Sequence, residues 1–299
     1  MNSFDDLLNN APAEGQQRSQ LSKEEYAAMK QAGREELYAL SDQTALEVAG
    51  DGGKFQQYID TQAKHGRSAV NTLLIMAQET QLPNGSATRV NDYDGWKDQG
   101  AYVKKNPISI SILDGHEYTK EDGTPGVGYD RIKVYDISQV DTRRMKFTPP
   151  PSYDDRQLLR ALVNSSTMKI TGAAELPGDL GAMTNPETGE ISVRKGMEFA
   201  DTFRSLSMEL AAAALENSNF VQTDPQFSAY CASYLLCKKY GVDTRGFNFT
   251  DAPSVFDGLD AQGIKGQLQQ MRDAAGDISA PMAKQLDAAQ RAAKSQEAR

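Results

Sequence analysis

Aromatic and basic side chains alternate between residues 89 and 105, where their types suit the binding of an unpaired nucleic acid strand. The set comprises Arg89, Tyr93, Trp96, Lys97, Tyr102, Lys104 and Lys105. Unpaired bases stack on aromatic rings, while ammonium and guanidinium groups neutralise the phosphates. If these rings and charges share one open face, the segment forms a surface for single-stranded DNA.

Trp96 is the only tryptophan of the chain, and it has a second interpretation. A lone tryptophan in a small α+β domain often packs in the core, because its large ring buries much apolar area. The sequence leaves both interpretations open. Tyr93 or Tyr102 completes the stacking platform in the first of them.

Three polar side chains precede this segment, two of them on the flanks of a predicted helix. Apolar residues from Val70 to Ala77 follow the i, i+3, i+4, i+7 spacing of an amphipathic helix. Asn71 and Gln78 flank its apolar stripe, where they could read base edges, cap the helix or bridge to a loop. Arg67 could bind a phosphate with two parallel hydrogen bonds.

Two strand patterns follow. Isoleucines alternate with serines from Ile108 to Ile112, and a similar alternation returns over residues 131–140, which together predict an antiparallel pair. The glycine-rich stretch at 125–128 lacks the Lys-Ser/Thr pair and the following helix of a phosphate-binding loop. It therefore favours a flexible hairpin tip.

Helices dominate the rest of the prediction. Ser22 and Glu25 match a capping box at the start of one helix, and residues 199–216 and 225–240 predict two more. The last forty residues, rich in alanine, glutamine, lysine and aspartate, indicate one or two solvated helices. Cys231 and Cys237 lie six residues apart on different helix faces, which is unsuitable for a disulfide bridge.

Composition limits the class of protein. The 299 residues, 39% hydrophobic and 24% charged, predict a globular protein of two domains. The formal charge of −9 argues against a protein that coats nucleic acid indiscriminately. Residues 54–146 hold thirteen basic and twelve acidic residues, so this part is nearly neutral and the remainder carries about −10. Neither a signal peptide nor a membrane span is expected, and the low cysteine content favours the cytoplasm.

Residues 66–139 resemble the N-terminal single-stranded-DNA-binding domain of the ArdC-like antirestriction family of conjugative plasmids and integrative elements. The matching features are Asn71 and Gln78, Ala87 to Val90, Tyr93 and Trp96, Gly100 with Val103 to Lys105, Ile108 to Leu113, and Val134 to Gln139. The resemblance implies that this half handles single-stranded DNA. Where the family usually has a Gly-Glu-Lys-Gly type turn after Lys105, this chain has Asn106 and Pro107.

The second half resembles the zincin-like metallopeptidase domain of the same family, which is similar to the ImmA/IrrE peptidases. Such domains bind zinc through a His-Glu-x-x-His helix, in which the glutamate is the general base. The corresponding residues here are Met208, Glu209 and Ala212, and the third ligand position falls near Tyr230. The only histidines, His65 and His116, lie in the first half. The resemblance therefore implies a degenerate site without metal, cofactor or catalytic residues, in which Glu209 is a structural residue.

These observations predict an α+β fold. The expected parts are a disordered N-terminus (1–18), an ArdC-like domain with a small antiparallel sheet (19–148), a proline-rich linker (149–156), a mostly helical peptidase-like domain (157–258) and a helical tail (259–299). The preferred hypothesis is a single-stranded-DNA-binding accessory protein of a mobile element, with an inactive peptidase-like domain. The alternative is a protein-interaction scaffold without DNA binding, whose acidic second half docks a protein partner.

Overall fold

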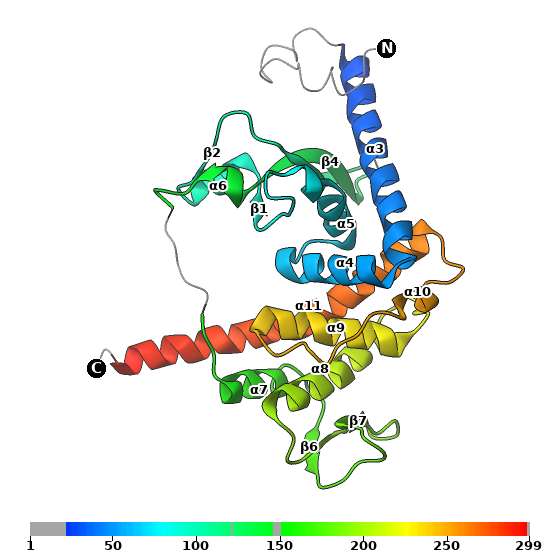
Figure 1. The fold of residues 1–299 in the computed structure, drawn as a ribbon, viewed down its shortest axis with the longest axis vertical. Coiled ribbons are helices and arrows are strands. Elements are labelled where there is room, and N and C mark those ends of the chain that lie inside the picture. The colour runs from blue at the N-terminus through cyan, green and yellow to red at the C-terminus, as the bar shows by residue number, and fades with distance from the viewer. Residues whose placement is uncertain (1–21, 121, 146–150, 298–299) are drawn as a thin grey trace.

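The structure is a computed structural model that describes residues 22–120, 122–145 and 151–297. It has a mixed α+β fold with a mainly helical second half, as the sequence predicts (Figure 1). The chain begins with helices α3 (Lys23–Ala49), α4 (Gly52–His65) and α5 (Ala69–Gln78). The predicted N-terminus at 1–18 and the first two prolines of the predicted linker lie outside the described residues.

The capping box at the start of α3 is confirmed. Ser22 Oγ accepts a hydrogen bond from Glu25 N–H at 3.1 Å, and the Glu25 carboxylate accepts one from Ser22 N–H at 2.8 Å. Each side chain therefore satisfies a backbone donor that the first turn of a helix leaves free. This reciprocal pair fixes where α3 begins.

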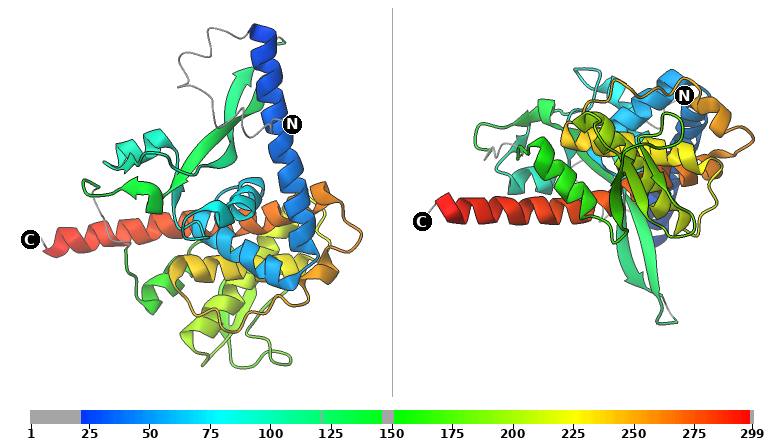
Figure 2. Two further views of the ribbon diagram at one scale, coloured as in Figure 1. Left: turned by 45° about the horizontal axis from the view of Figure 1, so that its top comes forward. Right: turned by 90° about the horizontal axis from the view of Figure 1, so that it is seen from below.

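The main sheet of the first half has the strand order β1-β4-β3, with β1 at Val90–Asn91, β3 at Ile110–Thr119 and β4 at Pro125–Asp136. Strands β3 and β4 form the predicted antiparallel pair and project from the body as a long hairpin (Figure 2). The glycine-rich stretch at 125–128 is not the hairpin tip, because it belongs to β4. The turn precedes it, and Lys120 N–H donates to the Thr124 carbonyl.

A smaller layer covers one end of this sheet. It consists of α6 (Tyr93–Asp98), β2 (Tyr102–Val103), η2 (Ile137–Gln139) and β5 (Val140–Asp141), whereas η1 (Glu79–Gln81) extends α5. Strands β2 and β5 pair antiparallel. Trp96, Ala101 and Val140 form the hydrophobic centre of this layer.

The second half combines helices with a three-stranded sheet. Its elements are α7 (Asp155–Val163), β6 (Ile170–Ala173), β7 (Ala182–Thr184), β8 (Ile191–Arg194), α8 (Phe199–Glu216), α9 (Pro225–Tyr240), α10 (Ala252–Val255) and α11 (Ala261–Glu297). Strand β8 lies in the middle, parallel to β6 and antiparallel to β7. Cys231 and Cys237 are buried in α9 as free thiols, as expected.

One hydrophobic core joins the two halves. The ring of Phe55 in α4 lies 5.5 Å from that of Phe227, 5.5 Å from that of Phe249 and 5.6 Å from that of Phe256. Contacts of this kind place α4 and α5 in the same core as α7, α8, α9 and α11. The predicted linker therefore does not separate two independent cores.

The prediction of a solvated tail is wrong. Helix α11 is continuous and contacts α7, α8 and α9 as well as α3 and α5. Its buried apolar side chains, among the residues whose burial is described, are Ile264, Leu268, Met271, Ala274, Ala275, Ile278, Met282 and Leu286. Within the described ranges, no helix has the length and apolarity needed to cross a membrane.

Candidate functional site

Trp96 is completely buried, so the prediction that bases stack on it is wrong. Its Nε1–H donates to the Tyr135 carbonyl at 2.9 Å, and its ring packs with Ala101 and Val140. The Arg89 guanidinium lies 5.3 Å from the ring centroid, which is within the range of a cation–π contact. The indole is therefore part of the hydrophobic core, and the Arg89 guanidinium contacts its ring.

Two predicted tyrosines remain open to solvent near this core. Tyr93, the first residue of α6, is 55% exposed, and Tyr102 in β2 is 46% exposed. Asp92 begins α6 by accepting a hydrogen bond from Gly95 N–H at 2.6 Å. Since Tyr93 and Lys97 are four residues apart, they share one side of this short helix. Stacking can therefore use these tyrosine rings instead of the indole.

Exposed lysines follow the tyrosines along the chain. Lys97, Lys104 and Lys105 are exposed, and the Lys104 ammonium donates to the Ser138 carbonyl at 3.0 Å. Asn106 then adopts a φ of 53°, which turns the chain after the lysine pair. The exposed ammonium groups of α6 and of the segment after β2 can meet phosphates.

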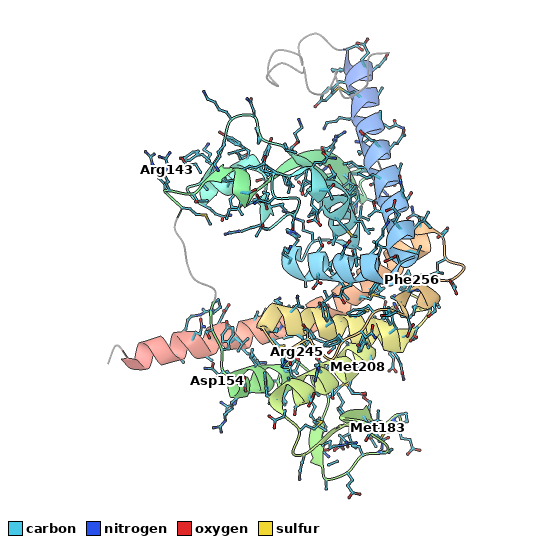
Figure 3. All side chains as sticks on the ribbon, in the orientation of Figure 1. Arg143, Asp154, Met183, Met208, Arg245 and Phe256 are labelled. Carbon is cyan, nitrogen blue, oxygen red and sulfur yellow. The ribbon has the colours of Figure 1, made fainter. Side chains whose placement is uncertain are left out.

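Carboxylates share this surface. Asp94 and Asp98 of α6 are exposed beside Lys97. Asp141 in β5 accepts a hydrogen bond from the Arg143 side chain at 2.9 Å, and Arg143 lies at the periphery of the first half (Figure 3). This hydrogen bond lowers the pKa of Asp141 to about 2. The positive charge here is therefore moderate.

Asn71 and Gln78 are committed to the sheet. Asn71 Nδ2–H donates to the Leu113 carbonyl at 2.8 Å, and its Oδ1 accepts from Leu113 N–H at 2.9 Å. Gln78 binds Ser111 in the same way, at 2.9 and 3.0 Å. These side-chain amides form hydrogen bonds with backbone N–H and C=O groups at the outer edge of β3, where the sheet has no further strand. Their predicted role in reading base edges is therefore wrong, and they bridge to a strand rather than to the loop that the alternative expected.

Arg67 lies behind the exposed surface. Its side chain is half-buried, and Nη2–H donates to the Val90 carbonyl at 3.3 Å. Burial lowers the pKa of this guanidinium, while Asp92 and Asp114 partly offset that effect. Arg67 thus supports β1, and the predicted phosphate contact is not favoured by this geometry.

Glu209 of α8 binds the edge of the second sheet. Its Oε2 accepts from Thr184 N–H at 2.9 Å and from Thr184 Oγ1–H at 2.6 Å. The neighbouring hydrogen bonds of Asn185 and Gly181 face β8, so Thr184 N–H points to the outer edge of β7. The carboxylate of Glu209 therefore completes a strand edge.

The other residues of the degenerate site pack against their surroundings. The Tyr230 hydroxyl accepts from Asn248 N–H at 2.7 Å, and its ring centroid lies 4.8 Å from that of Phe247. Met208, which Figure 3 labels on α8, and Ala212 are half-buried against the shared core. In the part of the chain that the structure describes, no three His, Cys, Asp or Glu side chains converge as a metal site.

Glu209→Ala is expected to lower the free energy of unfolding by about 1.5–3 kcal/mol, since a charge-assisted hydrogen bond is lost and Thr184 N–H loses its partner. Glu216→Ala, at the exposed end of the same helix, is the matched control and should change stability by less than about 0.5 kcal/mol. Urea denaturation measures both. Equal stability of the two variants would contradict the structural role of Glu209.

The sequence interpretation missed a second group of aromatic and basic side chains. Tyr26, Lys30, Arg34 and Tyr38 are spaced four residues apart and therefore share one side of α3. Lys30, Arg34 and Tyr38 face the β3–β4 hairpin, where Lys30 Nζ lies 3.1 Å from Asp130. The regular spacing in the sequence is the signal that could have found them.

No protein-family model and no curated protein matches this chain. Among solved structures, it is similar to the metal-free crystal structure of the antirestriction protein ArdC from plasmid R388. The TM-score is 0.52 at 14% identity, over 82% of this chain and 98% of that one. The Mn(II)-bound structure of the same protein gives a TM-score of 0.48 at 16% identity, over 72% and 84% of the two chains. The chain therefore has an ArdC-like fold.

Proposed function

We propose that this protein binds single-stranded DNA through its first half and acts as an accessory protein of a mobile element, of the conjugation or antirestriction type. The observation that carries the proposal is the exposed pair Tyr93 and Tyr102, which lies among the exposed lysines of α6 and of the segment after β2. The ArdC-like fold supports the same class of function.

The surface suits weak, sequence-tolerant binding. Each base that stacks on a tyrosine contributes about 1–3 kcal/mol, and every base offers a ring face. Lys97, Lys104 and Lys105 act on phosphates as point charges, which carry no base preference. Because Trp96 is buried, the affinity of this surface rests on smaller rings and on a moderate positive charge.

Fluorescence anisotropy with a labelled single strand of about 30 nucleotides tests the proposal. Replacing both Lys104 and Lys105 with alanine is expected to weaken binding and to reduce the slope of log K against log salt by about 1.4, or 0.7 per lost contact. Lys284→Ala, which removes one charge from α11, is the control and should leave the slope unchanged. Absence of saturable binding by the wild-type protein at low salt would overturn the proposal.

We also propose that the second half is not a metallopeptidase. Glu209 is bonded to Thr184, and Met208, Ala212 and Tyr230 replace imidazole and carboxylate ligands, so this set offers no three strong zinc ligands. No cofactor is assigned. Stoichiometric zinc in the purified protein, lost together with peptidase activity on chelation, would overturn this part.

The alternative is a protein-interaction scaffold. The burial of Trp96 favours it, because the largest ring of the predicted surface is not available to bases. The acidic excess of the chain outside residues 54–146 suits a basic protein partner. Failure of the anisotropy test would leave this function as the better account.

A further inference from the structure

A groove of about 380 Å³ lies between α3 and the projecting hairpin. Figure 2 shows the hairpin running beside α3 toward the start of that helix. The groove is lined by Lys30, Arg34, Tyr38, His116, Gly128, Tyr129 and Asp130. It therefore combines aromatic rings with cationic groups, and it shares no residue with the segment 89–105.

Two rings of the hairpin lie against glycines of the opposite strand. In the β3–β4 register, His116 lies opposite Gly128 and Tyr118 opposite Gly126. A Cβ atom added to Gly128 would come within 2.6 Å of His116 Nε2, and one added to Gly126 within 2.7 Å of Tyr118 Cζ. Each ring therefore covers the space above a glycine, with one side toward the strand.

The other side of these rings is open. Tyr118 is 47% exposed, His116 is exposed, and their centroids are 6.5 Å apart. Because the two residues alternate along β3, both lie on the same face of the hairpin. The face thus offers two neighbouring rings to solvent, tilted by 48° to each other, and exposed rings beside a strand can stack unpaired bases.

The charges of the groove are nearly balanced. Lys30 Nζ lies 3.1 Å and Arg34 Nη1 3.7 Å from Asp130 Oδ1. His116 Nδ1 lies 3.8 Å from Asp130 Oδ2, and Asp114 lies directly opposite Asp130 in the register, so this face of the hairpin carries two carboxylates. A phosphate can share Lys30 and Arg34, but stacking must supply most of the affinity.

We propose that unpaired DNA bases stack on His116 and Tyr118, with the adjoining phosphate on Lys30 and Arg34 in the α3–hairpin groove. This inference rests on the proposed function, and it supplies the stacking surface that the buried Trp96 does not. The groove favours a nucleic acid strand over a peptide because it presents ring faces beside cations. The part of the affinity that stacking contributes depends little on salt, in contrast to the phosphate contacts of Lys104 and Lys105.

The test compares Tyr118→Leu with Tyr118→Phe in the full-length chain. Leucine still covers Gly126 but has no ring face, whereas phenylalanine keeps the face. In the anisotropy assay, Tyr118→Leu is expected to weaken single-strand binding about 5-fold to 100-fold, by the same factor at low and high salt. Tyr118→Phe should bind within about twofold of the wild-type protein.

A second measurement does not depend on the folding of a variant. Ultraviolet cross-linking of the wild-type protein to a thymine strand, followed by mass spectrometry, should place an adduct on the peptide that contains His116 and Tyr118. Adducts confined to residues 93–105, or unchanged binding by Tyr118→Leu, would overturn the proposal that DNA binds in the groove. The proposed function would then stand, and the groove would be open to a protein partner. Absence of single-strand binding by the wild-type chain would contradict both the groove proposal and the proposed DNA-binding function.

Discussion

Leu268→Ala in α11 is expected to lower the free energy of unfolding by about 2–5 kcal/mol, the range for truncating a buried leucine. Leu268 is 1% exposed and lies in the core that joins the two halves. Removing its side chain leaves a cavity among helices that cannot fully close around it. Urea denaturation followed by circular dichroism measures the loss.

Polar contacts along α11 strengthen this expectation. The buried Lys265 forms an ion pair with Asp42 of α3, and Gln269 Oε1 accepts from Ala69 N–H at 2.9 Å. The helix therefore binds the first half through both apolar and polar groups. Deletion of α11, from residue 261 to the end of the chain, should abolish cooperative unfolding, because the shared core loses the apolar side chains of this helix.

The matched control is Asp277→Ala, on the exposed side of the same helix. It should change stability by less than about 0.5 kcal/mol. If Leu268→Ala were equally silent, α11 would behave as the solvated tail that composition predicted, and the shared core would be contradicted.

The sequence contained a signal for α11 that composition concealed. Ile264, Leu268, Met271, Ala275 and Ile278 are spaced by four and three residues, which is the pattern of a buried helical stripe. Alanine, glutamine and charged residues fill the positions between them, so the overall composition appears polar. The spacing of the apolar residues, which shows that they lie on one face of the helix, predicted the burial of α11 better than its composition did.

Local patterns were predicted well because their causes are local. The capping box joins residues 22 and 25, and the predicted strand is present as β3, with Ile110 and Ile112 buried. The predicted half-buried alternation is not, because Ile108 precedes the strand and is exposed, whereas Ser111 is buried. The capping box and the strand itself both follow from a few neighbouring side chains. The fold class and the β3–β4 pair were therefore within reach of the sequence.

The candidate site depended on contacts between distant parts of the chain. Trp96 donates to a carbonyl 39 residues away, and Asn71 binds a strand residue 42 positions away. Residue type indicates that such side chains form hydrogen bonds or are buried, but it does not indicate which residue is the partner. A tryptophan beside lysines therefore suggested an exposed binding surface, although its ring is buried at the centre of the smaller layer.

Asp136 at the end of β4 is expected to be among the most sensitive polar positions of the first half. Its side chain is fully buried and accepts three backbone hydrogen bonds, from Thr88 N–H at 2.6 Å, Arg89 N–H at 2.9 Å and Ser138 N–H at 3.0 Å. Asp136→Ala leaves these donors without that partner. The expected loss is about 3–5 kcal/mol, because each orphaned buried donor costs about 1–3 kcal/mol and water can relieve part of it.

The pH dependence of this loss follows from the pKa of Asp136. Burial alone would raise that pKa, but the N–H donors of Ser138, Arg89 and Thr88 outweigh burial and hold it below its ordinary value. The folded state therefore binds this proton less readily than the unfolded chain does. The stabilisation is complete above the unfolded-state pKa of about 3.9 and disappears as the pH falls through the lower folded-state pKa.

Denaturation of the wild-type protein and of Asp136→Asn between pH 7 and pH 3 separates the charge from the shape of this side chain. Asparagine keeps the shape but turns an amide group toward donors, so the variant should be less stable at pH 7. The difference should shrink below about pH 4, where Asp136 of the unfolded wild-type chain takes up a proton that the folded state, with its lower pKa, still resists. Asp257→Asn, at an exposed position, should follow the wild-type curve throughout. A difference between Asp136→Asn and wild type that stays constant with pH would show that the negative charge of Asp136 does not hold residues 88 and 89 against β4.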